Sequence, residues 1–67
     1  MQVDAIGIAA GRVWGFLAEN GESSRAQIKK ALPDLDEFTI AAAIGWLARE
    51  DKVILVQAGR AFNVALK

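Results

Sequence analysis

The side chains of this 67-residue chain that could do chemistry are few, and they do not form a catalytic set. Glu50 and Asp51 are adjacent carboxylates, and Ser23 and Ser24 are adjacent hydroxyls. The sequence contains no histidine to activate a serine and no cysteine to act as a nucleophile or a metal ligand. A phosphate-binding Gly-x-x-x-x-Gly-Lys loop is also absent from it. We therefore expect no enzyme activity, no cofactor, no metal and no small-molecule substrate.

The basic side chains could instead contact the phosphates of a nucleic acid. Arg25, Lys29 and Lys30 fall near one side of a predicted helix, and Arg60 lies in a predicted turn. However, Lys+Arg and Asp+Glu both number 8, so the formal charge is zero and no strong field is focused on DNA. An ordinary solvated surface is the simpler interpretation of these residues, and any binding of duplex DNA should be weak.

The apolar periodicity of the first third predicts a helix over residues 3–20. Ile6, Ala10, Val13 and Leu17 recur at helical spacing and form one stripe. Gly21 follows Asn20 and can adopt the left-handed conformation that commonly ends a helix.

Two further helices are predicted from capping signals. Ser24 followed by Gln27 has the form of a capping box, and Pro33 ends the helix that Ser24 begins. Its buried face is expected to consist of Ile28, Ala31 and Leu32. Asp36 is the expected N-cap of a third helix, which runs to Arg49 or Glu50.

Residues 52–57 and 61–66 are rich in β-branched and aromatic side chains and flank a short turn that contains glycine. This pattern predicts a β-hairpin. A short edge strand near residues 22–23 is signalled only weakly. The order helix, helix, helix, hairpin indicates an α+β fold of the winged helix-turn-helix type, with a three-helix core and the hairpin as wing, in one domain over residues 1–67.

Two segments carry a closer resemblance. The first reads Ile6-Gly7-x-x-Ala10-Gly11-x-Val13-Trp14-x-x-Leu17, and the second is Ala43-Ile44-Gly45-Trp46-Leu47-Ala48-Arg49-Glu50-Asp51-Lys52. Together they resemble a family of small stand-alone bacterial and archaeal winged-helix proteins of unknown function. The resemblance covers nearly the whole chain. It implies the winged-helix fold and a homodimer, and it implies no activity.

The third predicted helix has the wrong chemistry for reading DNA bases. Base edges are recognised by hydrogen-bonding side chains such as Arg, Asn and Gln. Positions 41, 42, 43, 45 and 46, which a generic winged helix directs into the major groove, hold three alanines, a glycine and a tryptophan. We interpret Phe38, Ala42, Gly45 and Trp46 as a protein interface. The alternatives are that Trp46 is simply part of the core, or that the chain is a DNA-binding regulator with an atypical recognition helix.

The composition also favours self-association. Hydrophobic residues make up 54% of the chain without glycine, against about 45–50% with glycine in typical domains. A domain of this size buries only about 60% of its unfolded surface. The expected partner is therefore a second copy of the chain, forming a homodimer, or another protein. No segment predicts a membrane span or a signal peptide, so a cytoplasmic protein is expected.

Gly7, Gly11 and Gly15 repeat at every fourth position of the first predicted helix. Glycine inside a helix costs roughly 0.5–1 kcal/mol relative to alanine, so three of them suggest close approach of another backbone. Packing within the chain is the favoured interpretation, and packing against a second chain is the alternative.

Overall fold

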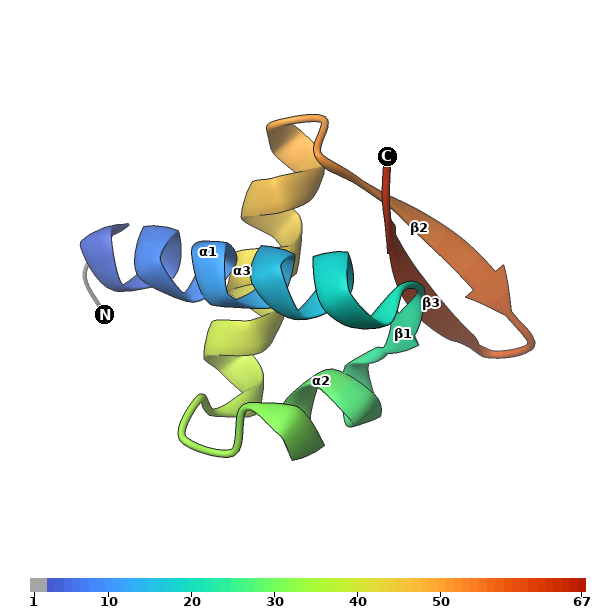
Figure 1. The fold of residues 1–67 in the computed structure, drawn as a ribbon, viewed down its shortest axis with the longest axis horizontal. Helices are drawn as coiled ribbons and strands as arrows, with labels where there is room; N and C mark the ends of the chain where they lie inside the picture. The colour runs from blue at the N-terminus through green and yellow to red at the C-terminus, as the bar shows by residue number, and fades with distance from the viewer. Residues whose placement is uncertain (1–2) are drawn as a thin grey trace.

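The computed structural model describes residues 3–67 and has the predicted winged-helix order. Helix α1 spans Val3–Asn20, strand β1 spans Ser23–Ser24, and helix α2 spans Arg25–Ala31. Helix α3 spans Glu37–Arg49, and strands β2 (Val53–Ala58) and β3 (Ala61–Leu66) form the hairpin. In Figure 1, α1 crosses in front of α3, α2 lies below them, and the hairpin closes one side of the molecule.

The helix boundaries follow from the predicted caps. The Ser24 hydroxyl accepts a hydrogen bond from the Gln27 N–H at 3.1 Å, and the Gln27 side chain accepts one from the Ser24 N–H at 2.8 Å. The Asp36 carboxylate accepts the Thr39 N–H at 2.7 Å. Gly21 ends α1 with φ 79° and donates to the Leu17 carbonyl. Each bond satisfies a backbone or cap group that a helix end leaves without an intrahelical partner.

The three strands form one antiparallel sheet in the order β1-β3-β2. In the hairpin, Val53 is opposite Leu66 and Ala58 is opposite Ala61, without interruption. The short strand predicted near residues 22–23 exists at Ser23–Ser24 and pairs with β3. Strand β3 is therefore the central strand, and β2 forms the free edge of the sheet.

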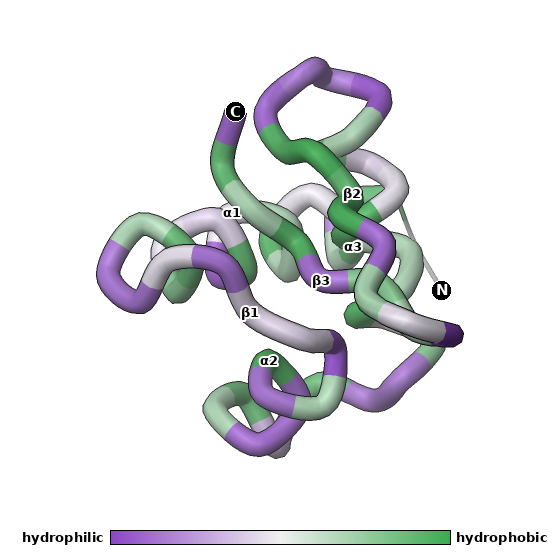
Figure 2. The backbone as a smooth tube through the Cα atoms, turned by 90° about the vertical axis from the view of Figure 1, so that its right-hand side faces the viewer, coloured by the Kyte–Doolittle hydropathy of each residue, from purple (hydrophilic) through white to green (hydrophobic). Residues whose placement is uncertain are grey.

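The core lies where α1, α3 and the inner face of the sheet meet. Its most deeply buried large side chains are Val13, Leu17, Ile28 and Ile40. In Figure 2, hydrophobic residues lie along both strands of the hairpin, although only part of the sheet faces the core. Ile54, Leu55 and Phe62 of the hairpin are exposed, whereas Leu66 is half-buried against the core.

Two expectations about burial were wrong in detail. Ala31 is exposed, because the short helix α2 turns only Ile28 fully into the core. In the stripe of α1, Ile6 is half-buried, and Ala9 is buried beside the predicted Ala10, Val13 and Leu17. Ala43 does not face outward but is fully buried, because it lies three residues after Ile40 on the same side of α3.

Candidate interaction surface

Helix α3 is apolar on two opposite sides, and the chain buries only one of them. Ile40, Ala43, Ile44 and Leu47 pack into the core as expected from their spacing. On the outer side, Phe38 is 71% exposed and Trp46 is 37% exposed, while Ala42 is half-buried and Gly45 is exposed. We call Phe38, Ala42, Gly45 and Trp46 the α3 face. Phe38 and Trp46 each lie four residues from Ala42, and Gly45 lies three residues after it, so the four form one strip along the helix.

Trp46 lies at the border between the α3 face and α1. Together with Trp14 it flanks a shallow groove whose lining also includes Gly7 and Gly11. The indole Cζ2 of Trp46 is 4.0 Å from the place that a Cβ would occupy at Gly7. Trp14 remains 44% exposed. Trp46 is thus not one of the buried core residues, and one edge of its ring faces the Gly7 position of α1 across the groove.

The glycines of α1 do not serve close packing within the chain. Among residues 3–67, a Cβ at Gly11 or Gly15 would meet nothing within 4 Å, and one at Gly7 would make only an ordinary contact. The expectation that α1 approaches another helix of the same chain through this strip was therefore wrong.

The hairpin exposes further apolar side chains. Residues directly opposite each other in an antiparallel pair lie on the same face of the sheet. Leu55 and Phe62 belong to the inner face near the wing tip but are 50% and 53% exposed. Ile54, on the outer face, is 47% exposed. The hairpin is therefore apolar on both faces, and neither face is fully covered by residues 3–67.

A second groove separates the wing from α2 and α3. Its apolar lining includes Ala41, Ile44, Leu55 and Phe62, and its charged residues are Arg25, Glu37 and Arg60. Arg25 lies 4.0 Å from Glu37, so one cation of this groove is already next to an anion. The side of α3 that faces the wing offers an alanine where a base-reading helix would offer a hydrogen-bonding side chain.

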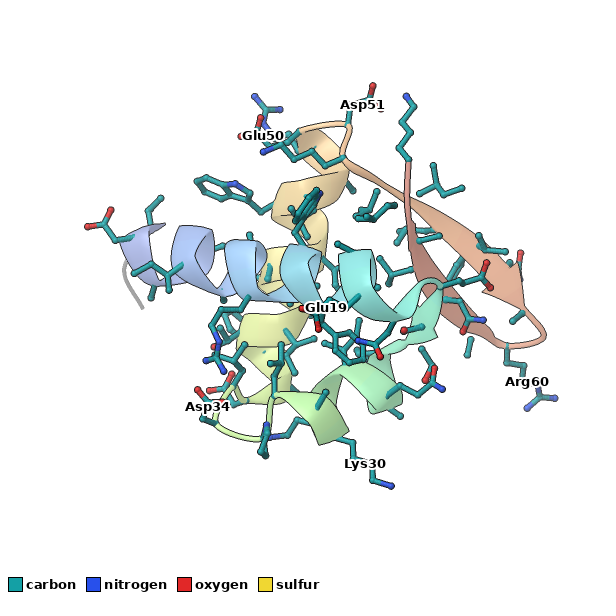
Figure 3. The ribbon with its side chains drawn as sticks, viewed as in Figure 1. Glu19, Lys30, Asp34, Glu50, Asp51 and Arg60 are labelled. Carbon is teal, nitrogen blue, oxygen red and sulfur yellow. The ribbon has the colours of Figure 1, made fainter. Side chains whose placement is uncertain are left out.

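The four basic residues considered for phosphate contact do not form one patch. The Lys29 ammonium donates to the carbonyls of Pro33 at 3.0 Å and Leu35 at 2.8 Å, so it holds the turn between α2 and α3. In Figure 3, Lys30 points away from the base of α2, and Arg60 extends from the wing tip. The role of Lys29 could not be predicted from the sequence, because the carbonyls that it binds belong to a turn without a regular pattern.

The loop before α3 is acidic, and its charges are held in place. The Arg12 guanidinium donates to both carboxylate oxygens of Asp34, with Nη2 at 3.0 Å from Oδ1, and this hydrogen bond lowers the pKa of Asp34. The hydrogen bond from Thr39 likewise lowers the pKa of Asp36. Both carboxylates are therefore negative near neutral pH and would repel a phosphate backbone at the start of α3.

The fold and this surface define a winged helix-turn-helix domain. Residues 1–66 match the family described as winged helix-turn-helix domain (DUF2582), and the chain belongs to this family. The expected family resemblance is therefore confirmed. No helix within residues 3–67 combines the length and the apolar character needed to cross a bilayer.

Three comparisons illustrate the breadth of the likeness. The chain is 39% identical over 64 residues to the uncharacterised protein MJ1608 of Methanocaldococcus jannaschii, covering 92% of this chain and 90% of that protein. The solution structure of BT2368 from Bacteroides thetaiotaomicron is 30% identical, with a TM-score of 0.87 over 98% of this chain and 79% of that one. The Zalpha domain of Carassius auratus PKZ, solved with Z-DNA, is 24% identical, with a TM-score of 0.82 over 94% of this chain and 98% of that one.

Proposed function

We propose that this protein is a non-enzymatic winged-helix binding module that acts as a homodimer through apolar contacts. The observation that carries the proposal is the α3 face, an apolar strip at the position where a DNA-reading winged helix is polar. Phe38, the most exposed large apolar side chain of α3, lies at one end of the strip, and Trp46 lies at the other. A second copy of the chain is the partner that we propose for this face.

The charges of the chain support a protein partner over DNA. The net charge is zero, and the carboxylates of Asp34 and Asp36 stand at the start of α3. Aromatic residues are enriched, and charged residues depleted, at the centres of protein interfaces. The α3 face contains two aromatic side chains and no charged one. Its chemistry thus matches that of an interface centre.

The open glycine positions on α1 give further support. Gly11 borders the groove beside Trp46 and has no neighbour that would contact a Cβ. A helix from a second copy can approach this strip more closely than it could approach alanine or a larger residue. The groove and the α3 face are continuous through Trp46, so one partner can cover both.

Matched charge insertions test this proposal. Phe38 lies on the α3 face and is 71% exposed, and Ala5 is an exposed apolar residue on the side of α1 away from Gly7, Gly11 and Gly15. Phe38→Arg should give a folded monomer, whereas Ala5→Arg should remain a dimer. Light scattering coupled to size exclusion, with circular dichroism as the folding control, compares them. A Phe38→Arg protein that stays dimeric, or equal dissociation of both variants, would remove the α3 face from the interface.

Binding of DNA is the alternative function. One observation favours it, because the Zalpha domain with the similar fold was solved in complex with Z-DNA. Arg60 at the wing tip, Arg25 and Lys30 would then contact phosphates, and Lys29 would have to leave the carbonyls that it now binds. Such binding would depend on the shape of the DNA, because α3 offers no side chain suited to base edges.

A further inference from the structure

Strand β2 is an edge of the sheet, and within residues 3–67 some of its backbone groups have no partner strand. The Lys67 N–H donates to the Lys52 carbonyl at 3.0 Å. Lys52 directly precedes β2 and Lys67 directly follows β3, so this pair continues the register of the hairpin. Hydrogen-bonded pairs alternate along an antiparallel ladder. The backbone groups of Ile54 and Val56 therefore point toward β3, whereas those of Val53, Leu55 and Gln57 point outward from the sheet.

This edge lacks the usual protection against pairing with another strand. Natural edges are commonly blocked by charged residues, proline, bulges or very short strands. Strand β2 reads Val-Ile-Leu-Val-Gln-Ala over six residues, with no charge and no proline, and its register with β3 has no bulge. The other edge, β1, has only two residues and leads directly into α2. The β1 edge is thus protected against pairing with another strand, whereas the β2 edge can pair with one.

We propose that β2 pairs antiparallel with β2 of a second copy, joining the two sheets into one across a two-fold axis. This inference rests on the proposed homodimer and identifies backbone pairing of the two β2 strands as a contact between its chains. A symmetric register centred on Leu55 places Leu55 against its own counterpart and Val53 against Gln57. All three outward-pointing residues then satisfy their backbone groups, and the inner face of one sheet continues as the inner face of the other.

The side chains suit this register. Ile54 of one copy lies beside Val56 of the second copy on the outer face, so an isoleucine that is 47% exposed gains an apolar neighbour. In Figure 2, α3 lies next to β2, on the side of the molecule where the sheet ends. The same axis therefore brings the two α3 helices toward each other.

Charge at the two ends of β2 is also compatible with the pairing. Figure 3 shows Arg60 at one end of the hairpin and Glu50 with Asp51 at the other. Antiparallel pairing brings the wing tip of one copy to the turn between α3 and β2 of the other. That turn also contains Lys52, while Asp51 is paired with Lys67, so Glu50 is the carboxylate that Arg60 would meet.

Amide hydrogen exchange of the wild-type protein tests the proposal without any variant. In a monomer, the amides of Ile54 and Val56 are protected by β3, whereas those of Leu55 and Gln57 exchange rapidly. In the paired dimer, all four are protected, and the protection of Leu55 and Gln57 is lost on dilution. In a mixed sample of labelled and unlabelled protein, a nuclear Overhauser contact should link the Hα of Ile54 to the Hα of Val56 in the second copy, because such non-hydrogen-bonded pairs approach most closely.

A pair of variants at one position gives the second test. Leu55→Pro removes an outward donor but no bond of the hairpin, since edge strands accept proline where the N–H faces solvent. It should raise the dissociation constant at least 100-fold, whereas Leu55→Ala, which keeps the donor, should raise it less than 10-fold. Equal effects of the two variants would overturn the edge pairing. A wild-type dimer whose Leu55 amide exchanges rapidly would overturn the edge pairing but not the homodimer. A wild-type monomer would overturn both.

Discussion

The two sides of α3 are both apolar, but one is buried and the other is exposed. Ile40, on the inner side, is fully buried between α1 and the rest of the core, whereas Phe38, two residues earlier, is 71% exposed. The difference arises because the other elements within residues 3–67, two helices and a small sheet, pack against the same side of α3. A substitution on the inner side should therefore act on folding, and one on the outer side should act on the proposed association.

The largest expected effect belongs to the inner side. Ile40→Ala should lower the free energy of unfolding by about 2–5 kcal/mol, because it removes a buried side chain and leaves a cavity. Ile40 is 0% exposed and has no solvent-facing surface to lose. Urea denaturation monitored by circular dichroism measures the change. A loss below about 0.5 kcal/mol, typical of surface sites, would mean that the inner side is not the core.

The outer side should respond in association and not in folding. Trp46→Ala should weaken the dimer by about 2 kcal/mol or more, as large aromatic anchors do, while the domain stays folded. Sedimentation velocity and circular dichroism of the same sample separate the two effects. A substitution that unfolds the domain would instead identify the contact of Trp46 with α1 as a core contact, and an unchanged dimer would exclude Trp46 from the interface.

A smaller effect is expected at the cap that positions the helix-turn-helix. Ser24→Ala removes the hydroxyl that accepts the Gln27 N–H and should cost about 0.5–2 kcal/mol of folding stability. The dissociation constant of the dimer should not change, because this cap lies at the start of α2. Thermal unfolding at several protein concentrations distinguishes the two effects. A loss of thermal stability that depends on protein concentration would mean that α2 contributes to the dimer interface.

The folding stability should depend on pH only in the acidic range. The folded-state pKa of Asp36 is lowered by the hydrogen bond from Thr39, and that of Asp34 by the one from Arg12. Their contributions are present above the ordinary value of 3.8 and are lost as the pH falls through the lowered folded-state values. Stability should therefore be flat from pH 5 to pH 7, about the range above both values, and fall below about pH 4. Asp36→Asn, which keeps a capping acceptor but cannot ionise, should flatten part of this fall.

The smallest expected signal is binding to DNA. A neutral domain neutralises few phosphates, so its affinity for random duplex should be low and change little with salt. Titrations at two salt concentrations measure both quantities. Sub-micromolar affinity with a steep salt dependence that charge reversal at Lys30 and Arg60 abolishes would favour the regulator over the protein-binding module.

Much of the fold could be predicted because its signals are local. Ser24, Asp36 and Gly21 mark helix ends through bonds that span only a few residues, and all three are confirmed. The site was harder to predict, because exposure depends on what packs against a residue. Ala42 and Ala43 are neighbours of the same type, yet Ala43 is buried on the side of Ile40 and Ala42 is half-buried on the outer side. The glycines of α1 were misread for the same reason.

Sedimentation equilibrium of the wild-type protein tests the central claim most directly. A homodimer held by the α3 face and the β2 edge should be the dominant species at micromolar concentration and keep a mass of two chains as the concentration rises. A protein that remains a single chain at about 100 μM, far above the dissociation constant of a standard-size interface, would contradict the account.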